Sequence, residues 1–137
     1  MAQPLFLKAA GRFCHPFPQQ DEEDKKIGTE YLNKLKDFLL AHLDPDEVDK
    51  TGEIPDEVIK GLVDLGAFAM KVPKDYDGLG LRQINYNRAV HLVASYCGST
   101  AVVLSAHQSI GVPTPLAMFG TEEQKKKYLP LFRKGAI

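Results

Sequence analysis

Residues 22–43, EEDKKIGTEYLNKLKDFLLAHL, carry the pattern that decides the fold. Apolar side chains recur there three and four positions apart: Ile27, Tyr31, Leu35, Phe38, Leu39 and Leu43. This spacing predicts a helix with one buried stripe, because residues three and four apart share a helix face. The Asp44-Pro45 pair predicts the end of this helix, since proline disfavours the helical conformation of the residue before it.

The same periodicity recurs along the rest of the chain. Further helices are expected from Pro55 to Leu65, from Gln83 to Cys97, over 101–110, over 115–119 and from Glu122 onward. Ser99 or Thr100 is expected to cap the helix over 101–110. Thr121 and Gln124 match a capping box for the last helix, whose regular part should end at Pro130. The fold class predicted is therefore all-α, a bundle of about six helices with no strand.

The first residues are not expected to be helical. Residues 1–20 are predicted to form an extended N-terminal arm laid on a neighbouring surface, because Pro4, Pro16 and Pro18 resist helix. An organelle transit peptide is the alternative interpretation, since this stretch is basic and has no acidic residue. The helical domain is then expected to span residues 21–137.

A second non-helical stretch is residues 74–81, KDYDGLGL, where Gly78 and Gly80 predict a turn-rich loop. The two glycines resemble the start of a phosphate-binding loop, but the residues that follow do not complete such a motif. A plain glycine turn is the prediction.

Composition excludes several classes of protein. The chain of 137 residues has 17 Lys and Arg against 18 Asp and Glu, so its net charge of −1 gives no attraction to nucleic acid. No apolar run approaches the roughly 18–20 residues of a transmembrane helix. The four histidines share no ligand spacing, and Cys14 and Cys97 form no metal-binding motif, so neither a metal site nor a disulfide framework is expected.

The segment over 101–110 is apolar nearly all round and is expected to be central. It also contains small residues, and Ala101 and Ser105 lie four positions apart on one helix face. Small residues allow a neighbouring helix to pack closely, or they leave a groove for an apolar ligand. Both interpretations are open on periodicity alone.

Two longer strings point to a known family. Residues 119–130, FGTEEQKKKYLP, and residues 65–81, LGAFAMKVPKDYDGLGL, together resemble the N-terminal helical domain of the acyl-CoA dehydrogenases. Residues 106–111, AHQSIG, and the arm residues 15–18, HPFP, resemble the very-long-chain branch in particular. The resemblance covers about residues 14–137.

The resemblance implies a flavoenzyme with three parts, of which this chain matches one. It implies FAD as cofactor and oxidation of a long-chain fatty acyl-CoA to trans-2-enoyl-CoA in fatty-acid β-oxidation. An electron-transfer flavoprotein is then expected to accept the electrons, and the full-length enzyme is expected to be a homo-oligomer, a dimer or a tetramer. The implied location is the bacterial cytoplasm, with the mitochondrial matrix as the alternative.

The family's β-domain and C-terminal bundle have no counterpart in this chain, which is expected to end where the β-domain begins. No catalytic or flavin-binding residue is therefore assigned, and the chain alone is expected to be inactive. The resemblance places the far end of the acyl pocket on six residues: Ala101, Val102, Val103, Ser105, Ala106 and Ile110. Their small members predict a pocket deep enough for long chains.

Two other functions are compatible with the same residues. An acyl-CoA oxidase of the same superfamily would share the helical domain and differ in how the reduced flavin is reoxidised. A stand-alone helical binding or interaction module would have lost the catalytic parts altogether.

Overall fold

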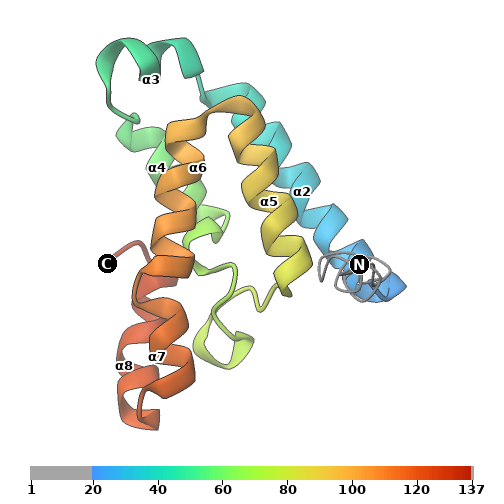
Figure 1. Ribbon diagram of the computed structural model, residues 1–137, viewed down its shortest axis with the longest axis vertical. Coiled ribbons are helices and arrows are strands. Elements are labelled where there is room, and N and C mark those ends of the chain that lie inside the picture. Colours follow the sequence, from blue (N-terminus) through green and yellow to red (C-terminus); the bar gives the residue numbers. More distant parts are fainter. Residues whose placement is uncertain (1–19, 137) are drawn as a thin grey trace, which may run out of the picture.

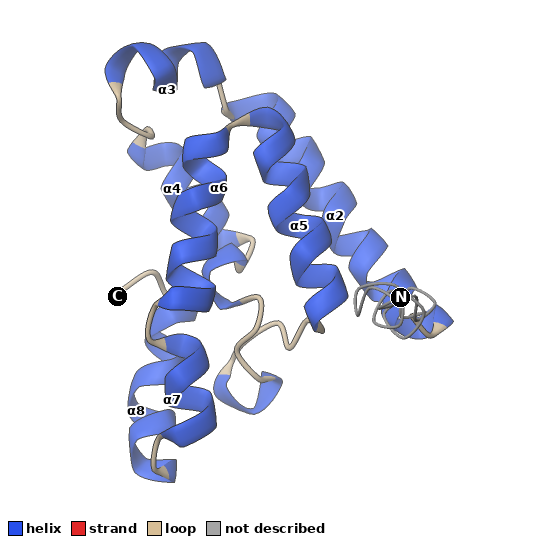
Figure 2. Ribbon diagram, in the orientation of Figure 1, coloured by secondary structure: helices blue, strands red, loops and turns tan. Residues whose placement is uncertain are grey.

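The computed structural model of the chain describes residues 20–136, and the regular elements within this range are all helical (Figure 1, Figure 2). The helices are α2 Glu22–His42, α3 Pro45–Thr51, α4 Asp56–Asp64, α5 Gln83–Tyr96, α6 Gly98–Ser105, α7 Pro113–Phe119 and α8 Glu122–Arg133. Short 3₁₀ turns span Ala67–Ala69 and Lys74–Tyr76, and a π-helical turn spans Ala106–Ile110. The all-α prediction is confirmed. The arm predicted over residues 1–20 lies outside the described residues except for Gln20.

Helix α2 follows the predicted apolar stripe. Its N-cap is Asp21, whose Oδ1 accepts a hydrogen bond from the backbone N–H of Asp24 at 2.8 Å. Leu35 and Leu39 are fully buried on the inner face. The helix ends before Leu43, so the sequence located both ends to within a residue.

A second, short helix, α3, follows α2 almost immediately. Asp44 accepts hydrogen bonds from the backbone N–H groups of Asp46 and Glu47, and Pro45 occupies the first turn of the short helix α3. The Asp-Pro pair that ends one helix therefore also begins the next, because proline at the first helical position loses no hydrogen bond. Helix α3 was not expected from the sequence, and Gly52, with φ of 72°, ends it.

The expected cap of α6 is wrong. The helix begins at Gly98, and Ser99 and Thr100 lie inside its first turn. Cys97 is the flanking residue, and no side chain caps the helix. Thr100 is instead fully buried, which shows that packing in the core determines its position.

The capping box of α8 is confirmed, but its predicted end is wrong. Thr121 Oγ1 accepts from the Gln124 N–H at 3.2 Å, and the Gln124 side chain accepts from the Thr121 N–H at 2.9 Å. Pro130 lies inside the helix, which continues to Arg133. Leu129 and Phe132 are buried on either side of the proline, so their packing outweighs the one backbone hydrogen bond that proline removes.

Helix α5 packs against both α2 and α6 and so lies at the centre of the arrangement (Figure 1). The main core collects buried side chains from α2 to α6: Leu35, Leu39, Leu43, Val48, Val58, Leu62, Ala67, Phe68, Met70, Leu81, Tyr86, Ala89, Val93, Cys97, Ala101 and Leu104. A smaller cluster attaches α8 to the segment after α4 through Ala69, Val72, Leu129 and Phe132. Helices α7 and α8 form the lower end of the molecule in Figure 1.

The glycines of the 74–81 loop form a turn, as predicted. A side chain on Gly78 would overlap the backbone carbonyl of Val72, so only glycine permits this approach. The N–H groups of Gly78 and Gly80 donate to the carbonyls of Pro73 at 3.1 Å and Val72 at 2.9 Å. These N–H groups are therefore used to fold the chain back on itself.

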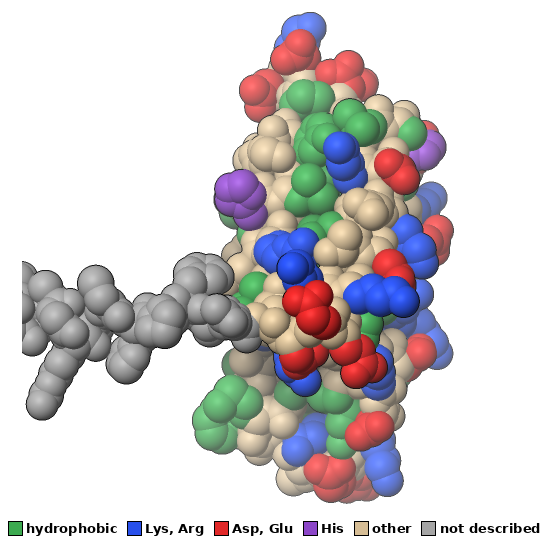
Figure 3. All heavy atoms as spheres, turned by 90° about the vertical axis from the view of Figure 1, so that its right-hand side faces the viewer, with side chains coloured by type: hydrophobic (Ala, Val, Ile, Leu, Met, Phe, Trp, Pro, Cys, Tyr) green, Lys and Arg blue, Asp and Glu red, His purple; other side chains and the backbone are tan. Residues whose placement is uncertain are grey.

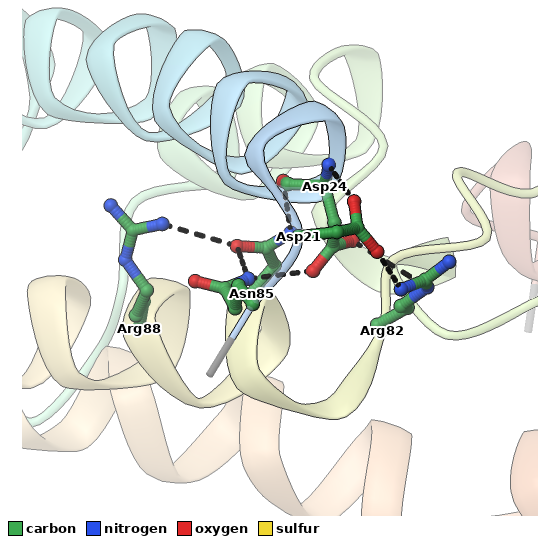
Figure 4. A network of polar contacts seen from close by, with 6 residues as sticks. Asp21, Asp24, Arg82, Asn85 and Arg88 are labelled. Carbon is green, nitrogen blue, oxygen red and sulfur yellow. Dashed lines mark hydrogen bonds and ion pairs between the residues drawn. The ribbon is translucent and has the colours of Figure 1, made fainter. Parts of the chain in front are cut away.

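A polar network joins the first turns of α2 and α5 (Figure 4). Asn85 Nδ2 donates to the carbonyl oxygen of Asp24 at 2.9 Å and to its Oδ1 at 3.1 Å. Arg82 forms an ion pair with Asp21 at 2.5 Å. The N–H of Asp24, and next the Arg82 guanidinium, lower the pKa of the Asp21 carboxyl below its ordinary value. The network fixes the start of α2 against the start of α5.

No helix among residues 20–136 combines the length and apolar character needed to cross a membrane. Within the same range, no group of three or more His, Cys, Asp or Glu side chains is arranged to hold a metal ion. The surface formed by α2 and α5 mixes side chains of both charge signs with apolar ones (Figure 3).

The central role of α2 in the core is testable at two neighbouring leucines. Leu39 is 0% exposed and Leu40 is 62% exposed. Leu39→Ala should lower the free energy of unfolding by about 2–5 kcal/mol, because it leaves a cavity in the core. Leu40→Ala, the matched control, should change it by less than about 0.5 kcal/mol. Urea unfolding of the two variants measures both values, and equal losses would contradict the packing described.

Candidate functional site

The segment predicted to line a pocket is a helix that changes its geometry halfway. Helix α6 passes at Ala106 into the π-helical turn Ala106–Ile110. The turn closes with a hydrogen bond from the Gly111 N–H to the Ala106 carbonyl at 2.7 Å, five residues apart. Single π-helical turns inside helices cost stability and are frequent at functional sites. This turn is therefore the first local feature that marks the segment as a candidate site.

The buried side of the turn is held by one glutamine. Gln108 is fully buried, and its Oε1 accepts a hydrogen bond from the backbone N–H of Lys71 at 3.2 Å. Its backbone carbonyl accepts from Thr114 Oγ1 at 2.7 Å. Its Nε2 has no hydrogen-bond partner among residues 20–136. Gln108 thus connects the turn to the segment after α4 and to α7.

The six predicted pocket residues do not share one face. Ala101 is buried in the main core, so at this position the small side chain serves helix packing. Val102 and Val103 point outward and are 66% and 40% exposed. Ser105 and Ala106 are half-buried beside them. The segment was expected to be central, but only part of it is buried: Ala101 and Leu104 lie in the core, whereas Val102 and Val103 are exposed.

The sixth residue, Ile110, closes the π-helical turn, and only its backbone is described. The assignment of these six residues to an acyl pocket stays a prediction. The outward face over Val102, Val103, Ser105 and Ala106 is the part of the set that can meet another molecule. These four residues, three on α6 and Ala106 at the start of the π-helical turn, form the outer α6 face.

Further apolar side chains are exposed on the helices that follow. Phe119 is 82% exposed, and Val112, Met118 and Tyr128 are also open to solvent. A shallow groove of about 300 Å³ lies between α7 and α8 and is lined by Val112, Leu116, Gln124, Tyr128 and Phe132. Large exposed apolar residues of this kind mark surfaces that contact other molecules or domains.

His107 lies between two aromatic rings and is half-buried. Its ring meets Phe68 edge-on at 4.9 Å between centroids and Phe132 at 5.2 Å. These contacts link the main core to α8 and give this histidine a packing role.

The acidic residues at the start of α8 are not placed for proton abstraction. Glu122 is exposed and accepts hydrogen bonds from the Tyr76 hydroxyl at 2.8 Å and from Lys125 Nζ at 3.1 Å. The Tyr76 hydrogen bond, and next that from Lys125, lower the pKa of the Glu122 carboxyl. A carboxylate stabilised in this way is a weaker base, and Glu122 lies at the exposed start of a surface helix.

Comparison with known proteins assigns the family. Residues 23–136 match the family model described as the acyl-CoA dehydrogenase N-terminal domain. The chain belongs to the acyl-CoA dehydrogenase family. The helical order of α2 to α8 is therefore the fold of that family's N-terminal domain, as the strings over 65–81 and 119–130 indicated.

Individual relatives agree with this assignment. The chain is 43% identical over 140 residues to "Probable acyl-CoA dehydrogenase FadE10" of Mycobacterium tuberculosis, covering 99% of the chain and 21% of the relative. It is 35% identical to the very long-chain specific acyl-CoA dehydrogenase of Mus musculus, covering 88% of the chain and 18% of the relative. The chain thus spans about a fifth of the length of the curated relatives it matches.

A solved structure shows the same domain. Butyryl-CoA dehydrogenase from Megasphaera elsdenii matches with a TM-score of 0.72 and 30% sequence identity, over 89% of this chain and 32% of that one. The resemblance to the acyl-CoA dehydrogenases read from the sequence is confirmed.

Sequence reasoning missed the residues that shape the turn. Gln108 follows Leu104 by four positions and therefore lies on the same, buried helix face. This spacing could have indicated from the sequence that Gln108 is buried. No sequence pattern pointed to Thr114, because its hydroxyl donates a hydrogen bond to the carbonyl of Gln108, six residues earlier across an irregular turn.

The π-helical turn is testable at a pair of glycines. A Cβ on Gly111 would lie 2.5 Å from the His107 carbonyl oxygen, whereas a Cβ on Gly98 would meet nothing within 4 Å. Gly111→Ala should lower the free energy of unfolding by about 1–3 kcal/mol, because the turn must shift. Gly98→Ala should be neutral or stabilising by up to about 1 kcal/mol, since alanine favours helix. Denaturant unfolding of both variants tests the turn, and a tolerated Gly111→Ala would argue against it.

Proposed function

We propose that this chain is the N-terminal part of a flavin-dependent acyl-CoA dehydrogenase that oxidises long-chain fatty acyl-CoA to trans-2-enoyl-CoA in β-oxidation. The outer α6 face lines the far end of the acyl pocket. Membership of the family supports the reaction class, and the likeness to a very long-chain specific relative supports the chain length.

The observation that carries the proposal is the composition of the outer α6 face. Val102 and Val103 present exposed apolar surface, which favours an apolar ligand. Ser105 and Ala106, beside them, are half-buried and have small side chains. Each methylene buried there contributes about 0.8 kcal/mol, so four additional carbons favour a long chain by about 3 kcal/mol.

Glycine-rich loops bind the pyrophosphate of a dinucleotide through backbone N–H groups that are free to donate. The only glycine pair that resembled such a loop, Gly78 and Gly80, uses its N–H groups on the carbonyls of Pro73 and Val72. We therefore assign FAD binding and the catalytic base to other parts of a longer protein and expect this chain alone to be inactive.

An electron-transfer flavoprotein is proposed as the acceptor, and a dimer or tetramer as the state of the full-length enzyme. The bacterial cytoplasm is the proposed location on the basis of the mycobacterial relative, and the mitochondrial matrix is the alternative. Nucleic acid is not a proposed partner, because the net charge is −1. A stand-alone helical binding or interaction module is the alternative, and such a module could also use the exposed Phe119 as a contact residue.

The experiment compares chain-length profiles in the complete enzyme. Ala106→Gln should lower kcat/KM for long-chain relative to medium-chain thioesters by about tenfold or more, because the larger side chain displaces at least two methylenes worth about 1.6 kcal/mol. The control is Ala41→Gln, the same substitution at an exposed position of α2. It should leave the ratio unchanged. An unaltered profile in Ala106→Gln would refute the pocket assignment.

A further inference from the structure

A groove runs between α2 and α5 on the side of the molecule shown in Figure 3. Its volume is about 820 Å³, within the range of roughly 300–1,000 Å³ that ligand sites occupy. The residues that line it are Gln20, Thr29, Leu32, Asn33, Lys36, Ile84, Asn87, Arg88, His91, Leu92 and Ser95. None of these was singled out from the sequence, and the groove is separate from the outer α6 face.

The groove combines an apolar floor with a basic rim. Leu32, Ile84 and Leu92 are half-buried and supply the floor. The charged lining residues are Lys36 and Arg88, and there is no carboxylate among the lining side chains. Arg88 donates to Asn85 Oδ1 at 3.2 Å and is thereby held at the groove wall. The apolar floor therefore favours an apolar occupant. Lys36 and Arg88 would repel an occupant with a positive charge.

Gln20 places the start of the described chain in this groove. Its Nε2 donates to Asp24 Oδ2 at 2.6 Å and to Asn85 Oδ1 at 2.9 Å, so the network of Figure 4 anchors it between the two helices. Because Gln20 is covalently joined to the residues before it, docking of those residues in the groove would be an intramolecular event with a lowered entropic cost.

We propose that residues 13–19, FCHPFPQ, dock into the groove between α2 and α5. Phe13 and Phe17 supply the apolar surface, and the stretch contains no Lys, Arg, Asp or Glu. Pro16 and Pro18 restrict the unbound chain to extended conformations, so little conformational entropy is lost on docking. The basic residues of the arm, Lys8 and Arg12, precede this stretch in the sequence.

The geometry allows one test by disulfide trapping with the natural Cys14. Six residues separate Cys14 from Gln20, and an extended chain of that length reaches about 20 Å. Thr29 lies nine residues along α2, about 14 Å from Gln20. Glu30 lies at nearly the same distance but is turned by about 100° around the helix, away from the groove. A cysteine at either position is therefore within reach of an unattached arm.

The experiment introduces Thr29→Cys or Glu30→Cys into the intact protein and applies a mild thiol oxidant. Docking of residues 13–19 predicts that Cys14 cross-links to position 29 at least about tenfold faster than to position 30, as measured by peptide mapping under non-reducing conditions. Cys97 is buried, and the protein without an added cysteine controls for it. Phe17→Asp should remove the preference, because it places a charge on the apolar floor.

Equal cross-linking at positions 29 and 30 would overturn the proposal, since an unattached arm samples both. Absence of cross-linking at both positions would also overturn it, and is the result expected if a second copy, another part of the protein or an acidic partner covers the groove. A preference that survives Phe17→Asp would equally count against docking of the apolar stretch.

Discussion

Asn85 of α5 packs directly against the backbone of α2 at Gly28. A side chain on Gly28 would overlap the Asn85 amide, so α2 and α5 meet here without an intervening Cβ. The Asn85 amide is buried, so it cannot hydrogen-bond to water. It donates instead to the backbone carbonyl of Asp24 at 2.9 Å. This contact sets how α2 crosses α5. The position of α6, which packs on the other side of α5, follows from it.

Local signals predicted much of the fold. Helices α2, α4, α5 and α8 were found because periodicity, proline, glycine and capping residues act within a few positions of the residues they affect. The misses share a different cause. Pro130 remains helical because Leu129 and Phe132 are buried on either side of it, and α3 forms because Asp44 caps a turn that Pro45 tolerates. The spacing of apolar residues does not show tertiary packing. It also does not show that the Asp44-Pro45 pair both ends α2 and begins α3.

For the candidate site, periodicity predicted the α6 helix, and packing at Ala101 is the one interpretation of its small residues that the fold bears out. The assignment of the segment to an acyl pocket stays a prediction. Ala101 packs in the core, whereas Ser105 and Ala106 lie on the outer α6 face. The π-helical turn depends on Gln108 reaching Lys71, a contact 37 positions apart in the chain. Apolar side chains are exposed on α6, α7 and α8, among them Val102, Met118 and Tyr128.

The most direct measurement is a structure of the complete enzyme with a long-chain acyl thioester bound. The account predicts that the terminal carbons of the acyl chain lie within about 4.5 Å of Val103 and Ala106, the distance of apolar contact. It would be contradicted by an acyl chain that ends elsewhere while other protein side chains cover the outer α6 face.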